Sequence, residues 1–207
     1  MTLPFHPDVK IVSEQTVWSG RFRVDVVQFR HRRFDGTLSG LRTWELFRRG
    51  RAAAVLPYDP VRDRVALIEQ FRLPALAAGM VPTMVEIPAG LCDADEDPAA
   101  TARREVTEES GLSLGPLHEV GQFLLTPGGS DEQCTLFIGQ ADLPDGPVTS
   151  GGLDAEQEDI RLKIMDAGDA IEQAIAGAYP NSVTAIALLW LAARRDWLRQ
   201  EWASWNS

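Results

Sequence analysis

A helix and a cluster of acidic side chains are predicted from residues 90–112, which read GLCDADEDPAATARREVTEESGL. Asp97 followed by Pro98 is typical of a helix start, because aspartate caps free backbone N–H groups and proline fits the first turn. Gly111 can take the left-handed conformation that often ends a helix. The sequence therefore predicts a helix from Asp97 to about Ser110.

Three glutamates lie on one face of this predicted helix. Glu105, Glu108 and Glu109 stand at i, i+3 and i+4, a spacing that brings side chains together. Like charges at this spacing destabilise an isolated helix, and acidic residues near the C-terminal end oppose the helix dipole. A bound divalent cation would relieve both penalties, and clustered carboxylates suit Mg²⁺. For the three residues taken alone, a solvated acidic stripe is the alternative.

The residues just before the helix form a second candidate feature. A glycine at position 90 lets the backbone approach a ligand closely, so the carbonyl of Ala89 is placed to face a metal beside the helix carboxylates. Arg104 adjoins Glu105 and Glu108 along the helix. We expect Arg104 to form a structural ion pair.

Outward from this helix, the chain consists mostly of strands with a few inserted helices. This order predicts one α/β domain with a mixed sheet, residues 51–207, and a small antiparallel β subdomain, residues 1–50. Further helices are expected at Asp166–Ala176 and Pro180–Trp202. Turns are expected at Asp35-Gly36 and at Pro57–Pro60. The predicted strands are Val9–Val12, Arg21–Arg30, Gly40–Arg48, Ala52–Leu56, Val65–Gln70, Met84–Ile87, Leu117–Phe123, Cys134–Gln140 and Ile160–Met165.

Composition excludes several classes of partner. The net charge of −10 disfavours nucleic-acid binding, which needs a basic footprint, although a metal can still supply positive charge to a phosphate ligand. No apolar run is long enough to span a membrane. The two cysteines show no metal or disulfide pattern, which fits a reducing cytoplasm, and the three histidines lie far apart.

The stretch Gly90–Leu112 resembles the Nudix box, GX5EX7REUXEEXGU, at every position. Beyond it, Thr126-Pro127-Gly128-Gly129 is similar to a signature of the ADP-ribose pyrophosphatase subfamily, and residues 56–60, 68–72, 156–161 and 182–203 also look like that subfamily. The resemblance implies a Nudix α/β/α sandwich and a homodimer with exchanged N-terminal strands. It further implies hydrolysis of ADP-ribose to AMP and ribose 5-phosphate with two or three Mg²⁺ or Mn²⁺ ions.

Carried onto this chain, the resemblance assigns metal and catalytic roles residue by residue. It implies that Glu105 and Glu109 are catalytic metal ligands, and that Glu96 orients the box. Glu156, on the loop Thr149–Asp159, matches the proposed general base, with Glu158 and Glu132 as the alternatives. The implied metal ligands are the Ala89 carbonyl, Glu105, Glu109, Glu158 and, as a further candidate, Glu108.

The resemblance also implies substrate contacts. Arg72 and Arg49 suit a diphosphate, because their forked donors match phosphate oxygens. Trp44 stands where relatives carry arginine and Arg21 where they carry an aromatic residue, so the recognition of the base is left open. The remaining candidate substrate contacts are Glu45, Phe22, Leu91 and Thr126. Two alternatives remain: another nucleoside diphosphate derivative as the substrate, or a nucleotide-sensing module, which the intact box disfavours.

Overall fold

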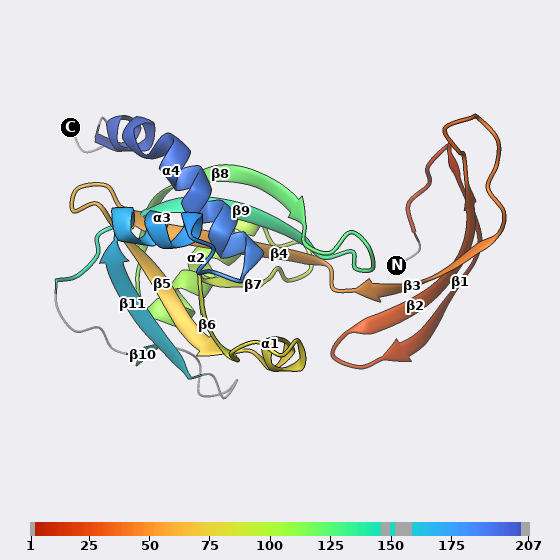
Figure 1. Cartoon of the computed structure of the whole chain (residues 1–207), viewed down its shortest axis with the longest axis horizontal. Coiled ribbons are helices and arrows are strands. Elements are labelled where there is room, and N and C mark those ends of the chain that lie inside the picture. The colour runs from red at the N-terminus through yellow and green to blue at the C-terminus, as the bar shows by residue number, and fades with distance from the viewer. Residues whose placement is uncertain (1–2, 146–149, 152–158, 204–207) are drawn as a thin grey trace. The chain divides into compact units, whose positions relative to one another are not determined.

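The computed structural model describes residues 3–145, 150–151 and 159–203, and the chain divides into two compact units (Figure 1). The first unit is made of Met1–Gly50 and Leu124–Gln133. The second is made of Arg51–Phe123 and Cys134–Ser207. The N-terminal strands therefore share their unit with a segment from the middle of the chain.

The first unit is a three-stranded antiparallel sheet in the order β1 (Val9–Ser19), β2 (Arg23–His31) and β3 (Arg42–Arg48). Strand β1 is much longer than the predicted Val9–Val12. Most of the strand is exposed, including the apolar Val17 and Trp18, and two register shifts break its alternation, so hydrophobic periodicity does not reveal it. The predicted turn at Asp35-Gly36 is confirmed, because Gly36 has a φ of 83°.

The second unit is built on a mixed eight-stranded sheet. The order is β10-β11-β5-β4-β9-β8, with β6 paired to β5 and β7 paired to β4. The central strand β4 is buried along nearly its whole length, as expected of a strand covered on both faces. The strands are β4 (Arg51–Asp59), β5 (Arg64–Phe71), β6 (Thr83–Glu86), β7 (Ala89–Leu91), β8 (Leu114–Leu124), β9 (Gln133–Ala141), β10 (Ser150–Gly151) and β11 (Ile160–Asp166).

Helices cover the two faces of this sheet, which gives the predicted α/β/α sandwich (Figure 1). Alternate residues of a strand point to opposite faces. Ala53 and Val55 of β4 pack against α2 (Pro98–Ser110), whereas Tyr58 lies 6.3 Å from Trp202 of α4 (Ser182–Ala203), measured between ring centroids. The shorter helices are α1 (Leu73–Ala77) and α3 (Ala167–Ile175).

The predicted helix is confirmed at both ends. The side chain of Asp97 accepts a hydrogen bond from the backbone N–H of Ala99, and Gly111 has a φ of 68° at the C-terminal cap. The turn predicted at Pro57–Pro60 is wrong in position, because fully buried Tyr58 stays in β4 and the chain turns at Pro60–Asp63, where Asp63 has a φ of 59°. In the described part of the chain, no helix combines the length and apolar character needed to cross a bilayer.

Candidate active site

Strand β7 places a backbone glycine against the helix that carries the glutamates. Gly90 pairs with Ala53 of β4, and α2 packs on the same strand through Ala102 and Val106. A Cβ atom at Gly90 would lie 1.8 Å from Oε1 and 2.1 Å from Cδ of Glu105. The glycine therefore leaves the space that the Glu105 carboxylate occupies.

Glu109 meets the same short strand. Its side chain is 4% exposed, and its Oε2 accepts a hydrogen bond of 3.1 Å from the backbone N–H of Ala89. A buried carboxylate is costly unless it is hydrogen-bonded or paired with a cation. The fold thus brings together Ala89, Glu105 and Glu109, three of the sequence-predicted metal ligands.

Arg104 lies among the carboxylates of this helix. Its Nη1 contacts Oε1 of Glu105 at 2.7 Å and Oε2 of Glu108 at 3.0 Å, and its Nη2 contacts Oε2 of Glu96 at 3.2 Å. The hydrogen bond from Arg104, aided by the backbone N–H of Asp93, lowers the pKa of Glu96 to about 2. Glu96 in turn does most to raise the pKa of Arg104. The predicted structural ion pair is confirmed.

The donors at this site fit a hard divalent cation. The side chains are carboxylates on one helix face, beside the Ala89 backbone, whose N–H donates to Glu109, and oxygen ligands of this kind suit Mg²⁺. Within the described ranges, no group of three or more histidine, cysteine, aspartate or glutamate side chains is already arranged to hold a metal ion. Arg104 engages two of the candidates, Glu105 and Glu108. The candidate ligand Glu158 and the candidate base Glu156 lie outside the described residues.

Two substrate candidates belong to this same unit. Arg72 follows β5, and its Nε–H donates to Oε2 of Glu86 at 2.8 Å, while its side chain remains 41% exposed. Leu91, on β7, is also partly exposed, and its carbonyl accepts from Nη2 of Arg104 at 3.3 Å.

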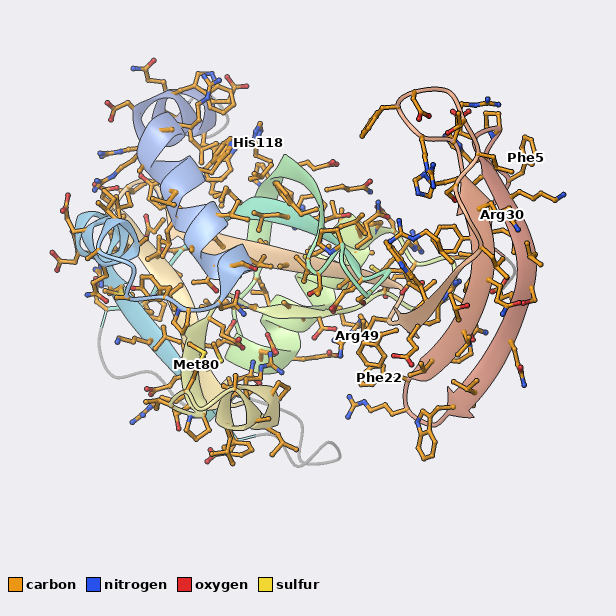
Figure 2. All side chains as sticks on the ribbon, turned by 45° about the vertical axis from the view of Figure 1, so that its right-hand side comes forward. Phe5, Phe22, Arg30, Arg49, Met80 and His118 are labelled. Atoms are coloured by element: carbon orange, nitrogen blue, oxygen red, sulfur yellow. The ribbon has the colours of Figure 1, made fainter. Side chains whose placement is uncertain are left out.

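The other substrate candidates lie in the first unit, where three of them form a cluster. The guanidinium of Arg49 stacks over the ring of Phe22 at 4.4 Å and contacts Glu132 at 2.9 Å, and Figure 2 shows Arg49 and Phe22 side by side. The guanidinium of Arg21 lies 5.8 Å from the same ring. Contacts of this kind between a cation and an aromatic face are attractive. Glu132, an alternative base, is thus engaged with Arg49.

Trp44 is not part of this cluster. Its ring meets Phe29 edge-on at 5.4 Å, and successive side chains of β3 alternate between faces, so Trp44 points away from the face that carries Glu45 and Phe47. Phe47 is the residue of β3 that contacts Phe22. Glu45 is exposed.

Thr126, also exposed, belongs to a tight turn in the segment that joins β8 to β9. Its carbonyl accepts hydrogen bonds from the backbone N–H groups of Gly129 and Ser130. In the same segment, Oδ1 of Asp131 accepts from the N–H of Arg49 at 2.7 Å, and Oδ2 pairs with Arg48 at 2.9 Å. Sequence reasoning missed Asp131, whose partners lie some eighty residues away along the chain.

Sequence reasoning also missed Glu86, although a signal was present. A charged residue between the apolar Val85 and Ile87, inside a predicted strand, indicates a paired carboxylate. Glu86 is 4% exposed and contacts Arg72, Gln70 and Asn181.

Residues 48–184 match the family model described as NUDIX domain. A protein of Escherichia coli named ADP-ribose pyrophosphatase is 39% identical over 198 residues, which cover 95% of this chain and 93% of the relative. A Salmonella arizonae protein named GDP-mannose pyrophosphatase is 32% identical over 148 residues, covering 71% of this chain and 76% of the relative.

A solved structure shares the fold. It is described as an ADP compounds hydrolase and superposes with a TM-score of 0.69. The match covers 96% of this chain and 98% of that one, at 21% sequence identity. At this identity the likeness establishes the architecture and leaves the chemistry to the site residues.

Proposed function

The chain belongs to the NUDIX domain family, and from that premise we propose that it hydrolyses the diphosphate bond of ADP-ribose to AMP and ribose 5-phosphate. The observation that carries this choice of substrate is the match to an ADP-ribose pyrophosphatase along 95% of the chain. The position of the Glu105 carboxylate over Gly90 supports diphosphate hydrolysis itself, because it brings one candidate metal ligand beside the backbone of Ala89 and Gly90.

The metal ligands in this proposal are Ala89, through its carbonyl, with Glu105, Glu109, Glu158 and the further candidate Glu108. They hold Mg²⁺, or Mn²⁺ in its place, as two or three ions. Bound there, divalent cations lower the pKa of water and stabilise negative charge on the phosphoryl oxygens. Glu96 and Arg104 keep the helix carboxylates in place through their ion pair.

Glu156 is the proposed general base. It accepts the proton of the water that attacks one phosphorus of the diphosphate, while the bond from that phosphorus to the bridging oxygen breaks and the other phosphate leaves. Arg72 and Arg49 bind the diphosphate oxygens with their forked donors, while Leu91 and Thr126 contact the substrate. The base thus lies on a different segment from the helix ligands Glu105 and Glu109, although it shares its loop with the ligand Glu158.

The adenosine part meets the first unit in this proposal. Phe22 stacks on adenine, and Glu45 and Arg21 complete the contacts, with the first unit supplied by the partner subunit of a strand-exchanged homodimer. Trp44 points to the other face of β3 and is not among these contacts. The pairing of Arg49 and Arg21 with the Phe22 ring supports a cluster that combines an aromatic face with positive charge. We further propose a cytoplasmic enzyme with neither nucleic acid nor membrane as a partner, in keeping with its net charge.

A substrate panel tests the proposal. Purified protein with Mg²⁺ is incubated with ADP-ribose, a GDP-sugar and a dinucleotide, and phosphate is measured after coupling to a phosphatase. We expect ADP-ribose to show the highest kcat/KM. Faster cleavage of the GDP-sugar would contradict the assignment, and absence of turnover with every diphosphate would support a nucleotide-sensing module.

A nucleotide sugar is the second candidate substrate, and one observation favours it. Trp44 stands outside the Phe22 cluster, so the base contacts differ from those that the resemblance implies. The relative named GDP-mannose pyrophosphatase matches a smaller share of the chain, which ranks this candidate lower.

A further inference from the structure

A buried carboxylate contacts Arg72, the arginine proposed to bind the diphosphate. Glu86 is 4% exposed at the end of β6, and one of its oxygens, Oε2, accepts from Nε of Arg72 at 2.8 Å and from Nε2 of Gln70 at 3.2 Å. Burying a charge is expensive unless it is paired and hydrogen-bonded. These donors therefore stabilise the negative charge of Glu86, and its buried side chain is held in one position.

The second oxygen of Glu86 is held by the start of α4. Oε1 accepts from Nδ2 of Asn181 at 2.7 Å, and Oδ1 of Asn181 accepts from the backbone N–H of Thr184 at 3.0 Å. The hydroxyl of Thr184, which is fully buried, accepts from the N–H of Ile87 at 3.1 Å. Side chains and backbone from β5, β6 and α4 thus hold one carboxylate in place.

We propose that Glu86 is a positioning residue that holds the guanidinium of Arg72 in the orientation that receives the substrate diphosphate. This inference rests on the proposed function, in which Arg72 binds the diphosphate. The Nε–H of Arg72 is committed to Glu86, while the side chain is 41% exposed, so the terminal nitrogens are the part offered to a ligand. A free arginine side chain loses rotamer freedom when it binds, and orienting it beforehand reduces that cost.

Two other roles for Glu86 predict different effects of its removal on substrate binding. A carboxylate that only neutralised Arg72 would weaken its attraction for phosphate, so removing the charge would tighten substrate binding. A carboxylate that only stabilised the fold would lower thermal stability and leave KM unchanged. The positioning role alone predicts weaker binding that depends on the presence of Arg72.

A double-mutant cycle on Glu86 and Arg72 separates these roles. We expect E86Q to lower kcat/KM for ADP-ribose by about tenfold to hundredfold, mostly through KM, the loss expected for a charge-assisted hydrogen bond. In the R72A background, E86Q should change kcat/KM less than twofold, because the group it acts through is gone. R72A should also lower the melting temperature, and adding E86Q should restore part of it, because an unpaired buried charge is removed.

Two further variants guard against a folding defect. N181S keeps a helix-capping hydroxyl but cannot reach Glu86 with an amide donor, so it should raise KM by a few fold with an intact fold. E69Q is the matched control: Glu69 lies on the neighbouring strand and pairs with Arg161, so its KM should stay at the wild-type value. Glu86 variants with unchanged or lowered KM, or with effects that add to those of R72A, would overturn the inference.

The wild-type assay distinguishes this failure from failure of the proposed function. If the wild-type protein cleaves another diphosphate of the panel and not ADP-ribose, the proposed substrate fails and the same cycle is run on the cleaved compound. If it cleaves none, calorimetric titration with ADP-ribose replaces KM by a dissociation constant. In either case the dependence of E86Q on Arg72 decides the positioning role.

Discussion

Replacing Gly90 by alanine should disable the site with little effect on the fold. The added Cβ would lie 1.8 Å from Oε1 of Glu105, whereas ordinary contacts begin at 3.4 Å, so the carboxylate must retreat by about 1.6 Å, the difference between the two values. A displacement of about 1 Å in a catalytic constellation can cost about 10²-fold in rate. We therefore expect kcat to fall by about 10²-fold and the Mg²⁺ concentration for half-maximal activity to rise.

Stability should respond differently from activity, because the clashing atoms are the far end of a flexible side chain and Gly90 does not have a positive φ. The assay is AMP formation from ADP-ribose over a Mg²⁺ titration, alongside a thermal melt. Gly40 provides the matched control: it also lacks a positive φ, and a Cβ there would meet nothing within 4 Å. Wild-type kcat and Mg²⁺ dependence in G90A would refute the reasoning that Glu105 acts from the space above this glycine.

Four other perturbations test the remaining roles. Glu156→Gln should lower kcat by about 10²–10⁴ if this residue is the base, and an unchanged kcat would move that role to another carboxylate. Arg49→Lys should raise KM by about tenfold, because lysine lacks the planar fork that stacks on Phe22, and a wild-type KM would remove Arg49 from the substrate contacts. The stability that Glu96 contributes is present above its ordinary pKa of 4.5 and is lost as the pH falls towards about 2, so melting curves of wild type and Glu96→Gln should converge across that window. EDTA should abolish turnover, and Mg²⁺ should restore it without a change in circular dichroism, whereas turnover that persists in EDTA would contradict metal dependence.

The parts of this fold that sequence predicted are those set by local chemistry. The caps of α2 depend on Asp97, Pro98 and Gly111, each of which favours its conformation without help from the rest of the chain. The strands β4 and β5 were predicted from their apolar runs. The spacing of the helix glutamates likewise placed Glu105 and Glu109 on one face.

The parts that sequence could not predict depend on distant partners. Strand β7 has three residues and exists because it pairs with β4, so no pattern of its own could reveal it. Arg72 was expected as a substrate contact. Its hydrogen bond to Glu86, fourteen residues away, could not be predicted, because it depends on the pairing of β5 with β6. Trp44 and Phe22 were both expected near the base, and only the alternation along β3 separates them.

The make-up of the first unit has a consequence for protein engineering. Removing residues 1–50 would delete the strands but leave behind the β8–β9 segment, whose Asp131 accepts from the backbone of Arg49 and pairs with Arg48. A truncated chain would display a loop shaped for a partner that it no longer encodes. Supplied as a separate peptide, residues 3–50 should therefore bind to the truncated chain, which makes this protein a natural candidate for a split-fragment complementation reporter.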